Sequence, residues 1–120
     1  MNIGDYVRTK KGIIGKIKVI DSQLDLEDLY LVKRNWYYKK DIIKSSPNII
    51  DLIEVGDYVN GEKVCYLKGQ INEEEVAHEE DVLYTEYIDE YGEWYGYAED
   101  EIESIVTHEM FESVEYKIGE

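Results

Sequence analysis

Short runs of alternating apolar and polar residues dominate the first half of the chain. In the run IIGKIKVI, Ile13, Ile17 and Val19 have one parity, and Lys16 and Lys18 have the other. Alternation with a period of two predicts a β-strand with one apolar face. Similar short runs bounded by turn residues predict further strands within residues 2–10, 29–32, 35–38 and 39–44.

Helix signals in this half are confined to its end. Ser46 followed by Pro47 is typical of a helix start, because serine caps free N–H groups and proline fits the first helical position. This pattern predicts a short helix or helical turn over residues 48–54. One proline and many Tyr, Ile and Val favour a β-rich fold for the rest.

The pattern then begins again. Residues 3–7, IGDYV, are matched by residues 55–59, VGDYV, and the Trp-Tyr pair at 36–37 is matched by the pair at 94–95. Residues 41–45 match 101–105 more loosely, and Thr107 is expected to cap a short amphipathic helix over 108–114. We therefore expect a mainly β protein of two tandem units, residues 1–54 and 55–120. Each is predicted to be a small SH3-like barrel that ends in a short helix. The alternative is one continuous antiparallel sheet with two similar hairpins.

Charge divides the chain in the same place. Residues 1–54 hold ten Lys/Arg and eight Asp/Glu, a net charge of +2, whereas residues 55–120 hold three and 20, a net charge of −17. A surface this acidic repels nucleic-acid phosphates and anionic membranes, and attracts a basic partner. No apolar run is long enough to span a bilayer, and the start lacks the pattern of a signal peptide. We therefore expect a cytoplasmic protein that binds neither membrane nor nucleic acid directly.

The stretch from Gly69 to Tyr116 concentrates this acidity. It contains 17 acidic residues and no Lys or Arg, a composition typical of disorder, but it also contains eight aromatic residues. We interpret it as a folded element that holds carboxylates at fixed spacing, and the alternative is a solvated surface. The predicted partner-binding residues are Glu86, Tyr87, Asp89, Glu90, Tyr91, Glu93, Tyr97, Glu99, Asp100, Glu101 and Glu103.

Other chemistry has weaker support. No glycine-rich phosphate loop, CxxC, HExxH or calcium-loop spacing is present, so we expect no enzyme activity, no cofactor and no specific metal site at His78 or His108. Cys65 lies in the apolar run VCYL and is expected to be a buried, inert thiol. Trp94 is expected in the core by its match with Trp36. The lysines of the first half, with Tyr37 and Tyr38, could form a basic aromatic face that binds peptide or nucleic acid. The eight acidic residues of the same half favour a solvated strand face instead.

Two segments resemble a known group of proteins. The run KSSPNIIDLIEVGDYVNG, residues 44–61, and the ending EIESIVTHEMFESVEYKI resemble segments of small, mostly uncharacterised prophage proteins of low-GC Gram-positive bacteria. The resemblance implies a phage accessory protein, acting in the cytoplasm of the bacterial host, and by itself no activity. Small acidic phage proteins are often inhibitors of host defence nucleases, including anti-CRISPR proteins, and this link is an analogy of size, charge and origin.

Together these observations predict a non-enzymatic inhibitor that mimics DNA. Its acidic second half would occupy a basic nucleic-acid groove of a host protein, such as an RNA-guided nuclease of the Cas9 type, where arginines read a short DNA motif. The alternative hypothesis is a non-catalytic SH3-like adaptor of phage origin that binds a peptide.

Overall fold

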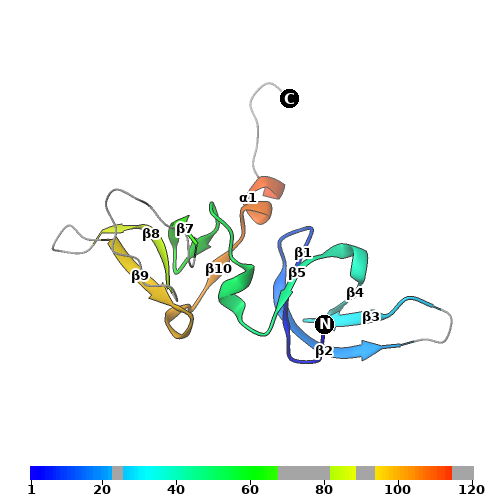
Figure 1. Cartoon of the computed structure of the whole chain (residues 1–120). Helices are drawn as coiled ribbons and strands as arrows, with labels where there is room; N and C mark the ends of the chain where they lie inside the picture. Colours follow the sequence, from blue (N-terminus) through cyan, green and yellow to red (C-terminus); the bar gives the residue numbers. More distant parts are fainter. Residues whose placement is uncertain (23–25, 68–81, 89–93, 115–120) are drawn as a thin grey trace, which may run out of the picture. The chain divides into compact units, whose positions relative to one another are not determined.

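The chain folds into two compact β-rich units, Met1–Leu52 and Ile53–Glu120. The computed structural model describes residues 1–22, 26–67, 82–88 and 94–114. Each unit contains one antiparallel sheet of five strands (Figure 1). Among the described residues, no helix has the length and apolar character needed to cross a membrane. The prediction of a mainly β fold is confirmed.

The first unit is built from β1 to β5. Its sheet has the strand order β4-β3-β2-β1-β5, and a short 3-10 helix, η1, precedes the last strand. Val7, Ile17, Tyr30 and Val32 form its buried apolar cluster. The elements are β1 Tyr6–Thr9, β2 Ile14–Asp21, β3 Leu29–Val32, β4 Asn35–Tyr38, η1 Lys39–Asp41, β5 Ile42–Ser46 and η2 Ile49–Leu52.

A bulge in β2 changes which of its residues point toward the core. Ile17 is buried as expected, but Val19 is 43% exposed although it shares the parity of Ile17. The register between β2 and β3 shifts between these two residues, and such a bulge reverses the facing of the residues beyond it. The predicted apolar side is therefore correct for Ile17 and wrong for Val19. Ile20, on the opposite parity, packs against the core instead.

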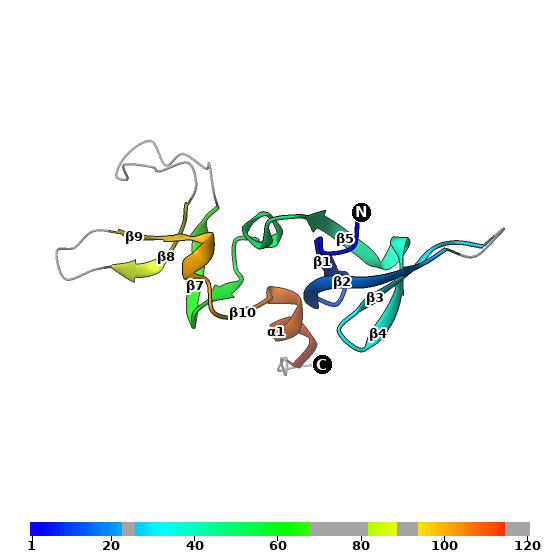
Figure 2. The same ribbon diagram turned by 90° about the horizontal axis from the view of Figure 1, so that it is seen from below.

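The second unit repeats this arrangement. Its sheet has the order β10-β6-β7-β8-β9, and a 3-10 helix, η3, again follows the fourth strand (Figure 2). Val59, Val64 and Leu83 are almost fully buried within it. The elements are β6 Tyr58–Val59, β7 Glu62–Tyr66, β8 Val82–Ile88, β9 Trp94–Ala98, η3 Glu99–Glu101, β10 Ile105–Val106 and α1 His108–Val114.

The two IGDYV-like segments form the same local structure. In each, a β-turn closes with a backbone bond, from Asp5 N to the Asn2 carbonyl at 3.0 Å and from Asp57 N to the Glu54 carbonyl at 3.1 Å. Gly4 and Gly56 have φ values of +93° and +96°, as the third position of a type II turn requires. The sequence match therefore reflects a shared turn that starts the first strand of each sheet.

The finer predictions of barrels and terminal helices have mixed outcomes. Within the described residues both strand orders are open, and neither sheet closes into a barrel, so an SH3-like barrel stays a prediction. The first unit ends in η2, a 3-10 helix of four residues that is shorter than the expected 48–54. The second ends in α1, a regular α-helix over the expected residues.

Asp57 connects the beginning and the end of the second unit. Its carboxylate is fully buried and accepts hydrogen bonds from Glu54 N at 2.7 Å and from His108 N at 2.9 Å. The second bond satisfies a free N–H at the start of α1, where the carboxylate also complements the helix dipole. Asp5, its counterpart, is partly exposed and accepts a bond from Asn2 N at 2.9 Å.

We expect Asp57→Ala to destabilise the second unit by about 3 kcal/mol, because two partly buried N–H groups lose a buried, charged acceptor. The matched change Asp5→Ala should cost the first unit only about 1 kcal/mol. Each unit holds one tryptophan, so urea unfolding followed by Trp94 fluorescence in Trp36→Phe protein, and by Trp36 fluorescence in Trp94→Phe protein, measures the two units separately. Equal losses in the two units would contradict the role assigned to Asp57.

Candidate functional site

The predicted partner-binding residues are only partly described by the structure. Glu86 is exposed on β8, Tyr97 is partly buried on β9, and Tyr87 belongs to β8. Glu99, Asp100, Glu101 and Glu103 lie together on η3 and the segment that follows it. Asp89, Glu90, Tyr91 and Glu93 lie outside the described residues. The described part of the predicted site is therefore centred on residues 99–104, which we call the acidic loop.

Asn60 fixes the backbone of the acidic loop. Its side-chain nitrogen donates to the Glu101 carbonyl at 2.9 Å, and its side-chain oxygen accepts from Glu103 N at 2.8 Å and Ser104 N at 3.1 Å. Asn60 has a φ of +52°, a left-handed conformation that asparagine tolerates better than most residues. One side chain thus bonds three residues of the loop from a different part of the sheet.

The carboxylates of this fixed loop reach solvent. Asp100, Glu101 and Glu103 are exposed, and Glu99 is partly buried. The Glu101 side chain also accepts a bond from Ala98 N at 3.1 Å, which strengthens the turn of η3. Because the backbone is held by hydrogen bonds, the spacing of the acidic residues is set by the fold. The role of this loop as a partner-binding array stays a prediction.

The same 3-10 helix carries opposite charge in the two units. Lys39, Lys40 and Asp41 form η1, and Glu99, Asp100 and Glu101 form η3. The flanking backbone is nearly the same, with φ and ψ of −80° and 157° before η1 and −80° and 163° before η3. Since lysines occupy the first two positions of this element in the first unit, the fold does not require acidic residues there.

Tyr97 is tied to the interior of its own sheet. Its hydroxyl donates to Glu62 Oε2 at 2.8 Å, and the Thr85 hydroxyl donates to the same oxygen at 2.8 Å. Glu62 therefore links β7 to β8 and β9. The hydroxyl of Tyr97 is occupied within the unit, so any contact with a partner would use the exposed part of its ring.

Cys65 lies on β7 and is partly exposed rather than buried as expected. Burial of part of the thiol raises its pKa, and the negative charge of Glu86 raises it further, while Lys63 lowers it. The thiol form is therefore favoured over the reactive thiolate. The expected inertness has an electrostatic cause in addition to burial.

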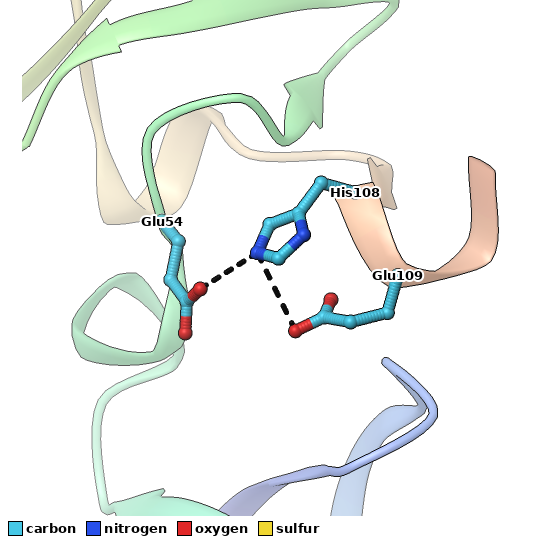
Figure 3. Close-up of side chains that lie close together, drawn as sticks. All are labelled: Glu54, His108 and Glu109. Atoms are coloured by element: carbon cyan, nitrogen blue, oxygen red, sulfur yellow. Dashed lines mark hydrogen bonds and ion pairs between the residues drawn. The ribbon is translucent and has the colours of Figure 1, made fainter. Parts of the chain in front are cut away.

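A histidine and two carboxylates converge at the start of α1 (Figure 3), and a third carboxylate, that of Glu112, lies near the same ring. His108 Nε2 lies 2.7 Å from Glu54 Oε1 and 3.4 Å from Glu109 Oε1, and Nδ1 lies 3.4 Å from Glu112 Oε1. One atom each of Glu54, His108 and Glu109 lies within 4.8 Å of the others, a spacing that can hold a metal ion. The sequence gives no sign of this cluster, because Glu54 and His108 are 54 positions apart. Only the adjacent His108-Glu109 pair was visible.

The first unit carries an open pocket of about 640 Å³ beside its exposed tryptophan. Trp36 is 48% exposed, so the expectation that Trp94 is buried by analogy with Trp36 loses its basis. The side chain of Trp94 lies outside the described residues. The pocket is lined by Thr9, Lys10, Lys11, Ile13, Asn35, Trp36, Tyr37 and Asp41.

We expect the Cys65 thiol of the native protein to react with iodoacetamide more slowly than the thiol of the urea-unfolded protein at pH 8. The raised pKa reduces the thiolate fraction in the folded state. The difference between the native and the unfolded reaction rate should therefore narrow as the pH rises past the pKa of the native thiol. Glu86→Gln should accelerate the native reaction by removing a negative neighbour. An unchanged rate in this variant would show that burial alone protects the thiol. Mass spectrometry of the modified chain gives both rates.

The chain was compared with protein families, curated proteins and solved structures. No family model, no curated protein and no solved structure matches this chain.

Proposed function

We propose that the protein is a non-catalytic inhibitor whose acidic second unit binds a basic nucleic-acid groove of a host protein. The phage origin, the cytoplasm of a bacterial host and a pair of tandem SH3-like units belong to the same proposal. The target class that fits best is a host defence nuclease that is guided by RNA, such as Cas9. In these enzymes arginines and lysines hold nucleic acid, and carboxylates can take the place of its phosphates.

The charge reversal between η1 and η3 carries this proposal. The same element tolerates Lys39 and Lys40 in the first unit and has Glu99 and Asp100 in the second. Concentrating like charges destabilises a compact unit through repulsion. Acidic residues that the fold does not require, placed where they repel one another, are best explained by a partner that they attract.

The spacing of the carboxylates is compatible with phosphate mimicry. Duplex DNA presents one negative charge per roughly 1.7 Å of its axis, counting both strands. Residues two apart on one face of a strand are about 6.6–6.8 Å apart, and neighbouring strands place others about 5 Å to the side. The exposed carboxylates of Glu86 on β8 and of Asp100, Glu101 and Glu103 in the acidic loop are the described groups that could take the place of phosphates.

A charge swap tests the proposal with little risk to the fold. Glu99→Lys combined with Asp100→Lys gives η3 the first two residues of η1, while Glu101 keeps its bond to Ala98. We expect association with a guide-loaded Cas9-type nuclease at about 0.1 M salt to slow by tenfold or more, since steering depends on local charge. Stopped-flow fluorescence measures the rate, and DNA cleavage in the presence of the protein measures inhibition.

The reciprocal swap in the first unit is the matched control. Lys39→Glu combined with Lys40→Asp makes the whole chain more acidic but leaves η3 unchanged, so association and inhibition should be retained. If the swap in the first unit and the swap in the second have the same effect, the acidic loop is not the binding surface. Binding of the wild-type protein should also fall at about 0.5 M salt and in the presence of competing DNA.

A second candidate function is supported by the pocket on the first unit. Exposed Trp36 beside Lys10 and Lys11 resembles the aromatic and charged surfaces that bind peptides. In this case the protein would be a non-catalytic adaptor, and the acidic unit would serve solubility.

Trp36→Ala separates the two functions. If the protein is an adaptor, Trp36→Ala should weaken its affinity for the partner by about tenfold or more, as is usual for an aromatic anchor. Binding of the wild-type adaptor should persist at high salt. A groove-blocking inhibitor should behave like the wild-type protein when Trp36 is removed. Pull-down from host lysate at both salt concentrations, with the captured proteins identified by mass spectrometry, distinguishes these outcomes.

A further inference from the structure

We propose that Glu54, His108 and Glu109 form a binding site for a single Zn²⁺ ion in the second unit. The site is separate from the acidic loop and does not depend on the function proposed above. It consists of an imidazole nitrogen and two carboxylates, a donor set that zinc accepts.

The distances need little adjustment to accommodate the ion. With metal–ligand bonds of about 2.0–2.1 Å, two ligand atoms of a tetrahedral site lie about 3.3 Å apart. Glu109 Oε1 is already 3.4 Å from His108 Nε2. Glu54 Oε1, at 2.7 Å, is at hydrogen-bonding distance and would move back slightly to admit the ion. The ion binds Nε2 in its deprotonated form, so the neutral ring would carry its one proton on Nδ1, and any further proton on the ring would pass to the solvent.

The second ring nitrogen of His108 also lies beside a carboxylate. Nδ1 of His108 faces the Glu112 carboxylate at 3.4 Å, one turn later on α1. A carboxylate beside the non-ligating nitrogen is a common partner of zinc-binding histidines, because it favours a proton on that nitrogen and orients the ring. Glu112 is therefore assigned as a positioning residue and not as a ligand.

The buried Asp57 places the ligands before any ion arrives. One of its oxygens bonds the backbone N–H of Glu54, and the other bonds the backbone N–H of His108. The two ligand-bearing segments are thus fixed by a group that does not itself bind the ion. This preorganisation distinguishes the cluster from acidic residues that happen to share a surface.

The donor set favours zinc over the hard cations. Ca²⁺ and Mg²⁺ prefer oxygen ligands alone, whereas imidazole nitrogen suits Zn²⁺. The three side chains are between 16% and 32% exposed, so an ion can reach them from solvent. Three protein ligands leave a fourth position for water or for a group from a partner.

Isothermal titration of the full chain with ZnCl₂, in a buffer that contains excess MgCl₂, tests the site. Magnesium occupies the many surface carboxylates, so we expect one strong Zn²⁺ equivalent per chain to remain. His108→Gln should weaken this binding by more than tenfold, and Glu112→Gln should weaken it by about tenfold, as for outer-shell partners of zinc sites. The bond from residue 108 N to Asp57 is made by the backbone, so circular dichroism should show His108→Gln folded.

His78→Gln provides the matched control, because His78 is the only other histidine of the chain. Zinc affinity should be unchanged in this variant. The melting temperature should rise with ZnCl₂ in wild-type and His78→Gln protein but not in His108→Gln protein, since an ion that binds only the native state stabilises it. Wild-type affinity in His108→Gln, loss of affinity in His78→Gln, or full displacement by magnesium would each overturn the proposal.

Discussion

A buried carboxylate bonded to two backbone N–H groups is the interaction on which the second unit depends. Asp57 ends the turn that begins the sheet and caps the helix that closes the unit. A fully buried aspartate is costly unless hydrogen bonds compensate it, and these bonds exist only when both segments are in place. The first unit shows the simpler version, in which Asp5 closes its own turn and remains partly exposed. The repeated turn thus acquires a second role in the unit that ends in an α-helix.

Local sequence patterns predicted those features of the fold that arise from local interactions. The IGDYV-like segments predicted a repeated unit, and both form the same turn, in which glycine and aspartate have defined roles. The alternation in β2 predicted a strand, but the bulge between Ile17 and Val19 depends on pairing with β3 and has no signal in β2 itself. Gly15 is a partial exception, because a glycine within a strand does indicate a close approach of the neighbouring strand. A Cβ atom at Gly15 would lie 2.8 Å from Val32 Cγ1, so only a residue without a Cβ fits there unless Val32 moves.

The candidate sites follow the same division. Acidity was readable from composition, and the structure adds the bonds through which Asn60 fixes the acidic loop. The contact between Glu54 and His108 was not readable, since it depends on how the chain returns to its starting turn. The exposure of Trp36 was also missed, because an aromatic residue in a strand is more often packed than solvated. Residues whose roles depend on distant partners are those for which the sequence alone is insufficient.

Comparing the two units separates what the fold needs from what it permits. Both use five strands in the same order and a 3-10 helix after the fourth strand, although the first unit is nearly neutral and the second strongly acidic. The stability common to both units therefore comes from features that they share, such as the turn and the buried strand residues, and the second unit adds the bond from Asp57 to α1. The features in which they differ include the reversed charge of η3 and the histidine cluster at α1. Because the shared fold does not account for these differences, they are where the separate functions of the two units should be sought.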